Sequence, residues 1–132
     1  MKKTRGIIFM LLISLSLFGF TACKGGENNI TYEQITQQHA KEIMETQKEY
    51  IIIDARTTEE FNEGHIENSI LIPEYEIAKR SEKELPDKDA LILVYCRSGR
   101  RSKIASEELV KLGYTNVKEF GGIIDWPYEI VK

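Results

Sequence analysis

The residues with the clearest chemical potential lie in one short segment around Cys96. Behind this thiol come Arg97, Ser98, Gly99, Arg100, Arg101, Ser102 and Lys103. An apolar run precedes Cys96 and a helical pattern follows Ser102, so the segment is predicted to be a loop between a strand and a helix. Such a loop directs several backbone N–H groups to one point, and Gly99 permits the positive φ that this requires. The N–H groups and the basic side chains favour a thiolate and an anion bonded to it, which predicts covalent catalysis on an anionic or sulfur-bearing substrate.

The alternative for Cys96 is a buried, inert thiol at the end of a strand. Most free cysteines in proteins behave as small apolar residues. Here three arginines and a glycine lie within five residues of the thiol, in a chain that is otherwise acidic. This local charge favours a reactive site, with Cys96 as the nucleophile and residues 97–101 as the binding loop.

The first 22 residues have the layout of a secretory signal peptide. Three basic residues stand before residue 6, and an apolar run follows over residues 6–20, too short for a comfortable membrane span. The exit, Phe20-Thr21-Ala22-Cys23, resembles the lipobox of bacterial lipoproteins. That resemblance implies cleavage before Cys23, a lipid on Cys23 and anchoring outside the cytoplasm. The alternative is an uncleaved N-terminal anchor. Residues 23–29 then form a flexible tether, and residues 30–132 form the domain.

The predicted mature chain is acidic. Loss of the leader removes three basic residues, which leaves 15 basic against 21 acidic residues and a formal charge of −6. Nucleic acid is therefore not expected as a partner. The sequence has two cysteines, and a lipid on Cys23 would leave Cys96 as a lone thiol. No His, Cys or Asp cluster has metal-ligand spacing, so neither a metal nor another cofactor is expected, and a monomer is the expected state.

Apolar runs alternate with helical patterns along the rest of the chain. Helices are expected from Thr31 to about residue 44, near 57–61, near 74–82 and over 102–112; strands are expected over 50–53, 69–72, 90–95 and 117–120. Continuous apolar strands that alternate with helices predict a single α/β domain with a mainly parallel central sheet, flanked by helices on both faces. Ligand sites of such sheets lie beyond the carboxyl ends of the strands, where Asp54 and Cys96 are expected.

Four segments resemble the rhodanese-like family, in the family's order. They are Ile51-Ile52-Ile53-Asp54-Ala55-Arg56, Glu60-Phe61-Asn62-Glu63-Gly64-His65-Ile66, the loop CRSGRRS from Cys96 to Ser102, and Gly121-Gly122-Ile123-Ile124-Asp125-Trp126. The resemblance spans roughly residues 49–131 and implies a sulfurtransferase. In this chemistry Cys96 would carry sulfur as a persulfide, held by the N–H groups of residues 97–101. The donor would be thiosulfate or another persulfide, and the acceptor cyanide or a thiol. The chain departs from the family at residues 67–69, where Pro-Gly-Ala is common.

Other polar residues are assigned supporting roles. Asp54, Arg56 and Ser102 are expected to position the loop, and Arg56 and Glu60 are expected to form internal salt bridges rather than to bind substrate. His65 is expected to be a hydrogen-bonding core residue, His39 a solvated one, and Trp126 part of the core.

Two other functions compete with sulfur transfer. Cysteine phosphatases and arsenate reductases use loops of the form Cys-x5-Arg. Cys96 and Arg101 instead enclose four residues, and this shorter ring suits a single sulfur atom better. The second competitor is a non-catalytic, partner-binding domain of the same fold, a class that often lacks the loop cysteine.

Overall fold

A computed structural model describes residues 31–132 of the chain. Its elements are β1 (Glu33–Gln34), α1 (Gln37–Thr46), β2 (Ile51–Asp54), α2 (Thr58–Glu63), β3 (Ser69–Leu71), η1 (Glu74–Glu76), α3 (Ile77–Glu84), β4 (Ile92–Cys96), α4 (Arg100–Lys111), β5 (Val117–Gly122) and η2 (Ile123–Asp125). The predicted leader, the lipidated Cys23 and the tether lie outside the described residues. Within 31–132, no helix has the length and apolar character needed to cross a membrane.

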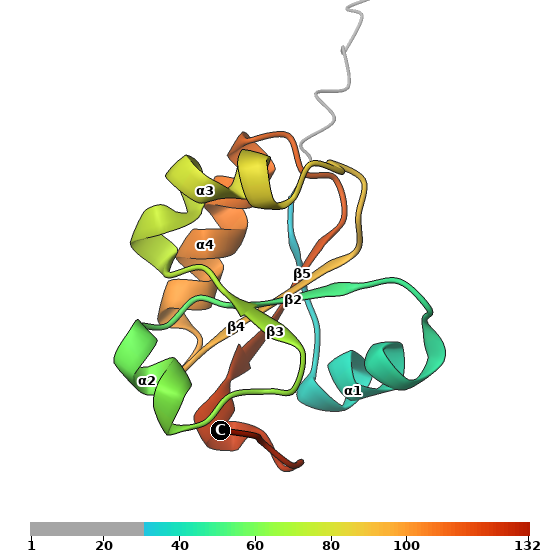
Figure 1. Cartoon of the computed structure of the whole chain (residues 1–132). Helices are drawn as coiled ribbons and strands as arrows, with labels where there is room; N and C mark the ends of the chain where they lie inside the picture. The colour runs from blue at the N-terminus through green and yellow to red at the C-terminus, as the bar shows by residue number, and fades with distance from the viewer. Residues whose placement is uncertain (1–30) are drawn as a thin grey trace, which may run out of the picture.

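The strands form one five-stranded parallel sheet in the order β1-β5-β4-β2-β3 (Figure 1). The strand β4 lies at the centre, and every residue in it is buried, as expected for an apolar strand covered on both faces. Asp54 pairs with Tyr95 at the carboxyl ends of β2 and β4. The register therefore places Asp54 and Cys96 on neighbouring strands at the carboxyl-terminal end of the sheet.

Helices cover both faces of the sheet, as predicted. On one face, buried residues of α3 and α4 such as Ile77 and Leu109 join Ile53, Val94 and Cys96 in a core cluster. On the other face, Ala40 and Ile43 of α1 pack with Leu93, Phe120 and Trp126. The two helical layers lie on opposite sides of the strands in Figure 1. The alternation of side chains along β4 supplies both clusters.

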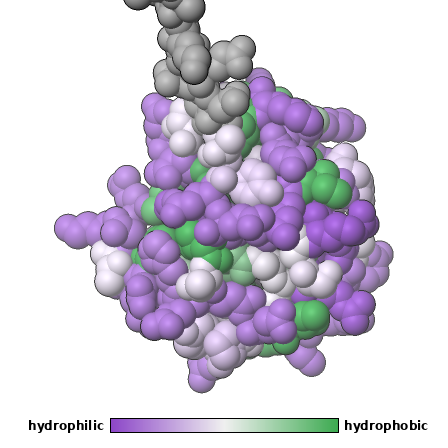
Figure 2. Space-filling view, turned by 180° about the vertical axis from the view of Figure 1, so that it is seen from behind, coloured by the Kyte–Doolittle hydropathy of each residue, from purple (hydrophilic) through white to green (hydrophobic). Residues whose placement is uncertain are grey.

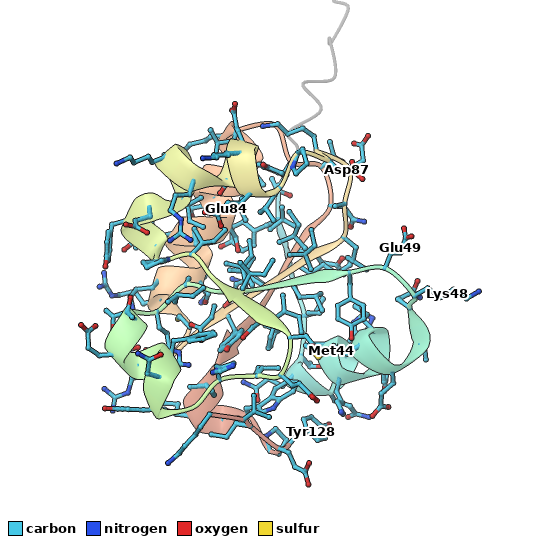
Figure 3. The ribbon with its side chains drawn as sticks, in the orientation of Figure 1. Met44, Lys48, Glu49, Glu84, Asp87 and Tyr128 are labelled. Atoms are coloured by element: carbon cyan, nitrogen blue, oxygen red, sulfur yellow. The ribbon has the colours of Figure 1, made fainter. Side chains whose placement is uncertain are left out.

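Charged side chains lie on the outside of this arrangement. Figure 3 shows Lys48, Glu49 and Asp87 directed away from the sheet. Figure 2 shows hydrophilic residues over most of the face opposite to that of Figure 1, with apolar patches between them. The described residues thus form a domain with two apolar cores and a largely polar surface.

The N-terminal part of the domain differs from the sequence prediction. The helix expected from Thr31 begins at Gln37, where the Thr36 hydroxyl accepts a hydrogen bond from the His39 N–H at 3.1 Å. Residues Glu33 and Gln34 form β1 instead, parallel to β5. A two-residue edge strand is fixed by its partner, and its own sequence carries little signal for it.

The helix α4 differs from the sequence prediction in two details, and the turn at residues 67–69 explains a departure from the family pattern. The helix α4 begins at Arg100, before the expected Ser102, and Ile104 is exposed rather than part of the core. At residues 67–69, Asn68 has φ 64°, a left-handed conformation that asparagine tolerates better than most residues. Asn68 thereby occupies the position where the family pattern commonly has glycine.

Candidate active site

The Cys96 sulfur lies in the bend between β4 and α4. The side chain is 1% exposed, and the Gly99 N–H donates a hydrogen bond to Sγ at 3.0 Å. Gly99 has φ 104°, in the left-handed region that glycine adopts without strain, as the sequence predicted. In the part of the chain that the structure describes, the amides of Arg100 and Arg101 donate to no protein acceptor. The first turn of α4 therefore offers free N–H groups beside the sulfur.

The Gly-Gly pair at the end of β5 supports this loop from behind. A Cβ atom on Gly122 would lie 2.0 Å from the Arg97 carbonyl oxygen and 2.5 Å from the Ser98 Cα. The backbone of the loop thus rests directly on Gly122, and the Ile124 N–H donates to the same Arg97 oxygen at 3.2 Å. Only glycine leaves room for this contact, which explains the Gly121-Gly122 motif in physical terms.

A buried polar chain connects the loop to β5. The Cys96 Sγ lies 3.3 Å from the Ser102 Oγ, and Ser102 donates a hydrogen bond to the Glu119 carboxylate at 2.6 Å. Both Ser102 and Glu119 are buried, at 0% and 3% exposure. Sequence reasoning expected Ser102 as a support but missed Glu119. The available signal was its place two residues after Val117, because alternate residues of a strand share a face and Val117 faces the Cys96 core.

The basic residues of the loop have different surroundings. Arg97 and Arg100, like Ser98, are exposed, while Arg101 is partly buried. The Arg101 guanidinium forms an ion pair with Glu60 of α2, with N–O distances of 2.8 and 3.1 Å. The hydrogen bond to Glu60 outweighs partial burial and raises the pKa of Arg101, with a smaller contribution from the charge of Cys96. Arg101 therefore ties the loop to α2 and also lies within electrostatic reach of the sulfur.

Asp54 and Arg56 form a buried ion pair under the site. The Asp54 carboxylate accepts hydrogen bonds from the Arg56 backbone N–H at 3.0 Å, from its guanidinium, and from the Tyr95 hydroxyl at 2.7 Å. Arg56 also donates to the Gly64 carbonyl oxygen at 2.7 Å. Salt bridges at Arg56 and Glu60 were expected; each pairs with a different partner, Asp54 and Arg101 respectively. Asp54 was expected to position the Cys96 loop; among the described residues its carboxylate makes no hydrogen bond to an amide of that loop and instead accepts from the Arg56 N–H of its own turn.

The two histidines have no direct part in this arrangement. His65 stacks on Phe61 with 3.7 Å between ring centroids, and its Nδ1 lies 3.0 Å from the Phe61 carbonyl oxygen. His39 is exposed on α1. His39 is solvated as expected, and His65 makes the expected hydrogen bond but is half-buried and lies outside both core clusters.

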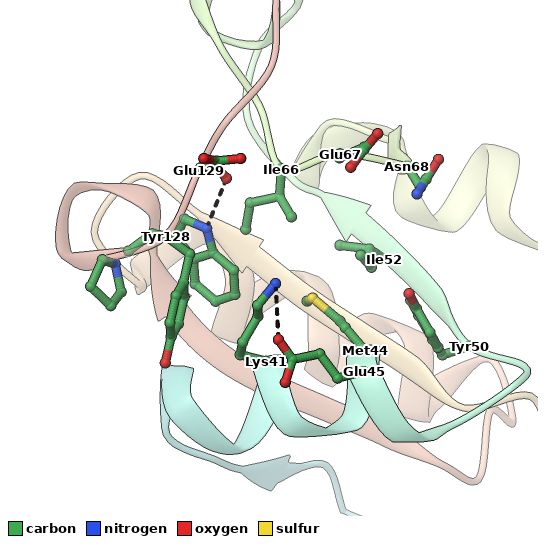
Figure 4. A pocket seen from close by; sticks show the side chains of 12 residues that line it. Lys41, Met44, Glu45, Tyr50, Ile52, Ile66, Glu67, Asn68, Tyr128 and Glu129 are labelled. Atoms are coloured by element: carbon green, nitrogen blue, oxygen red, sulfur yellow. Dashed lines mark hydrogen bonds and ion pairs between the residues drawn. The ribbon is translucent and has the colours of Figure 1, made fainter.

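Two hollows of the described domain, of about 670 and 690 Å³, have no residue of the Cys96 loop in their lining. One of about 670 Å³ is bordered by α1, the start of β2 and the C-terminal segment, with Trp126, Tyr128, Met44 and Lys41 around it (Figure 4). Lys41 is paired there with Glu45 at 3.4 Å. A shallower hollow of about 340 Å³ lies behind the loop and is lined by Ser98, Gly99, Lys103 and Glu119, among others. Cys96 is 1% exposed and lines none of these hollows.

Comparison with known proteins agrees with this geometry. The Rhodanese-like domain family matches residues 36–127. Thiosulfate sulfurtransferase PspE of Escherichia coli is 40% identical over 80 residues, which cover 61% of this chain and 77% of PspE. The adenylyltransferase and sulfurtransferase UBA4 of Candida albicans is 35% identical over 95 residues, 67% of this chain but 22% of that larger protein. A solved structure described as rhodanese with anions from Escherichia coli is 37% identical, with a TM-score of 0.59, and covers 63% of this chain and 98% of its own. With the fold, the Cys96 loop and the Gly-Gly support in place, the chain belongs to the rhodanese-like domain family.

Proposed function

We propose that this chain is a sulfurtransferase that carries sulfane sulfur as a persulfide on Cys96. The observation that carries the proposal is the position of the Cys96 sulfur at the start of α4. The sulfur accepts a hydrogen bond from the Gly99 N–H at 3.0 Å, and the next amides of the first turn of α4 are free. Relatives named thiosulfate sulfurtransferase support the same class of reaction. A sulfur anion bonded to Cys96 extends toward those amides, which hold it by charge-assisted hydrogen bonds.

The reaction has two balanced steps. The Cys96 thiolate attacks the outer sulfur of thiosulfate, a new S–S bond forms, the old S–S bond breaks, and sulfite leaves with the electron pair. Cys96 then bears an anionic outer sulfur. An acceptor thiolate or cyanide attacks that outer sulfur, and the Cys96 thiolate is the leaving group. No metal or redox cofactor takes part in either step.

Discharge requires an acceptor from outside the domain. Cys96 is the one cysteine within residues 31–132, so this part of the chain holds no second thiol to resolve the persulfide. A lipid on Cys23 would remove the other thiol of the chain. We therefore propose a small thiol or a protein thiol as the acceptor, met by a membrane-anchored domain outside the cytoplasm.

Phosphate chemistry is less well served by this loop. A tetrahedral oxyanion needs a guanidinium directed at it, whereas Arg101 is bound to Glu60 through two N–O contacts. Arg97 and Arg100 are exposed and can attract an anionic donor from solution. These positions favour capture of a sulfur anion by backbone amides over transfer of a phosphoryl group.

The test uses the full chain in detergent with Cys23→Ser, which leaves Cys96 as its single thiol. Intact mass is measured before and after thiosulfate, and again after cyanide, with thiocyanate assayed in solution. We expect a gain of one sulfur atom that cyanide reverses, and no gain when Cys96→Ser is added. Failure to gain sulfur from thiosulfate and from a polysulfide, with Cys96 still open to alkylation, would refute the proposal. Hydrolysis of p-nitrophenyl phosphate by the same sample would then point to a phosphatase.

A further inference from the structure

Glu119 is a carboxylate buried without a counter-charge. It is 3% exposed and accepts hydrogen bonds from the Ser102 hydroxyl at 2.6 Å and the Gly121 N–H at 2.8 Å. Both donors are neutral, and within residues 31–132 Glu119 forms no salt bridge. Burial of an ionised carboxylate with only neutral donors is unfavourable. The second link of the chain, from Ser102 to Cys96, indicates what the acid does.

Ser102 has a single hydroxyl proton and four possible partners for it, the most distant of which is the Gly121 carbonyl oxygen at 3.5 Å. Its Oγ lies 2.6 Å from a Glu119 oxygen, 3.0 Å from the Gly99 carbonyl oxygen and 3.3 Å from the Cys96 Sγ. When Glu119 is ionised, the short contact takes the proton, and Ser102 then turns a lone pair toward the sulfur. A lone pair on Ser102 can accept a hydrogen bond from the S–H of a thiol, and it repels the negative charge of a thiolate. When Glu119 carries a proton, it can donate to Ser102, which frees the Ser102 proton for the sulfur.

We propose that Glu119 is a positioning residue that shares one proton with Cys96 through Ser102. This inference rests on the proposed function, in which Cys96 reacts as a thiolate, and on the contacts of the Ser102 hydroxyl with Cys96 and Glu119. In the transfer, the S–H bond of Cys96 breaks as its proton passes to the Ser102 Oγ, and the Ser102 proton passes to the Glu119 carboxylate. No atom changes oxidation state. The buried site carries one negative charge before and after, so the thiolate appears without a second buried charge.

The surrounding charges are engaged elsewhere or exposed. Arg101 pairs with Glu60, and Arg56 pairs with Asp54. Lys118, next to Glu119 along β5, pairs with Glu33 of β1. The remaining charged or titratable groups of the loop, of η2 and of the first turns of α4 and α1 are exposed; they are Arg97, Arg100, Lys103, Asp125 and His39. Solvent screens those exposed groups, so the buried contact through Ser102 dominates the coupling.

The proton sharing through Ser102 should appear in the pH dependence of Cys96 alkylation. Coupled groups release their protons in two macroscopic steps that belong to the pair. In the Cys23→Ser chain, the logarithm of the Cys96 alkylation rate with iodoacetamide should rise with pH, level off and rise again. A single rise in this chain would contradict the inference, and this measurement needs no variant of Glu119.

The decisive comparison is Glu119→Gln, which keeps the shape and removes the charge. We expect a single rise in place of two. Its midpoint should lie about one pH unit below the upper midpoint of the parent, so that alkylation becomes about tenfold faster below that upper midpoint. Glu119→Asp keeps the acid but shortens its reach to Ser102, and it should restore the charge without restoring the two-step profile. Glu107→Gln, an exposed acid on α4, is the matched control and should leave the profile unchanged.

A double-mutant cycle with Ser102→Ala separates the hydrogen-bonded route from a through-space charge. If Ser102 carries the coupling, Glu119→Gln should shift the midpoint far less in the Ser102→Ala background. Equal shifts in both backgrounds, or a Glu119→Gln profile that overlays the parent, would overturn the inference. Alkylation needs no sulfur donor, so it stands apart from the persulfide test. A chain that shows the coupling but gains no sulfur would refute the function and leave the proton sharing intact.

Discussion

Replacing Gly122 with alanine tests whether the loop truly rests on β5. The new Cβ would lie 2.0 Å from the Arg97 carbonyl oxygen, 2.4 Å from its carbon and 2.5 Å from the Ser98 Cα. All three are backbone atoms, so no side chain can turn aside to make room. Gly122 has φ −122°, which alanine adopts freely, so the effect is steric and not conformational.

The magnitude follows from overpacking against rigid backbone. Insertion of one methyl group into a close-packed site costs about 1–3 kcal/mol and occasionally more. Because contact this short cannot persist, we expect the upper end, about 3 kcal/mol, or a shift of roughly 10–20 °C in Tm for a domain of this size. If the loop moves instead of the domain unfolding, the Gly99 N–H leaves the Cys96 sulfur and sulfur transfer falls.

The assay pairs urea unfolding with sulfur loading of Cys96 in the same samples. Gly113→Ala is the control: Gly113 has φ 96°, and a Cβ atom added there would meet nothing within 4 Å, so its cost is the left-handed conformation alone, about 1 kcal/mol. Gly113→Ala should leave sulfur loading unchanged. A Gly122→Ala protein with the parent's stability and full sulfur loading would refute the view that this contact positions the loop.

Three further predictions concern other parts of the molecule. Burial and the neighbouring Asp54 carboxylate raise the pKa of Tyr95. Above about pH 10 the folded chain therefore binds more protons than the unfolded chain, and the free energy of unfolding falls as pH rises. Tyr95→Phe should flatten this loss in urea titrations at alkaline pH, and an unchanged slope would contradict the reasoning. Glu60→Gln removes the partly exposed partner of Arg101 and should cost about 1 kcal/mol or less, a difference that shrinks in high salt; a larger, salt-independent loss would show another role. The chain recovered from the membrane fraction of a bacterial host should have lost residues 1–22 and gained the mass of a lipid, and Cys23→Ala should show neither change; an unlipidated full-length mass for the parent would favour an uncleaved anchor.

Much of the site is local in sequence and could be predicted without a fold. Cys96, the basic residues and Gly99 are contiguous, and a strand, a tight turn and a helix suffice to place the thiol at a helix N-terminus. Thr57 likewise caps α2 through the Glu60 N–H, a contact over three residues. The apolar run of β4 predicted burial on both faces because it has no polar alternation. These features depend on neighbours a few residues apart, which is the range over which sequence patterns are informative.

The remaining features depend on residues far apart in the chain. Glu33 and Gln34 form a strand only because β5 offers them an edge, and Glu119 meets Ser102 only because α4 packs over β5. The sequence predicted a salt bridge at Glu60 but not its partner; the structure shows that the partner is Arg101, 41 residues away. The sequence by itself determined which thiol lies at the end of β4 and directly before the first turn of α4. Tertiary structure decided which buried acid stands behind it, because the free energy of a buried charge depends on partners that only the folded chain brings together.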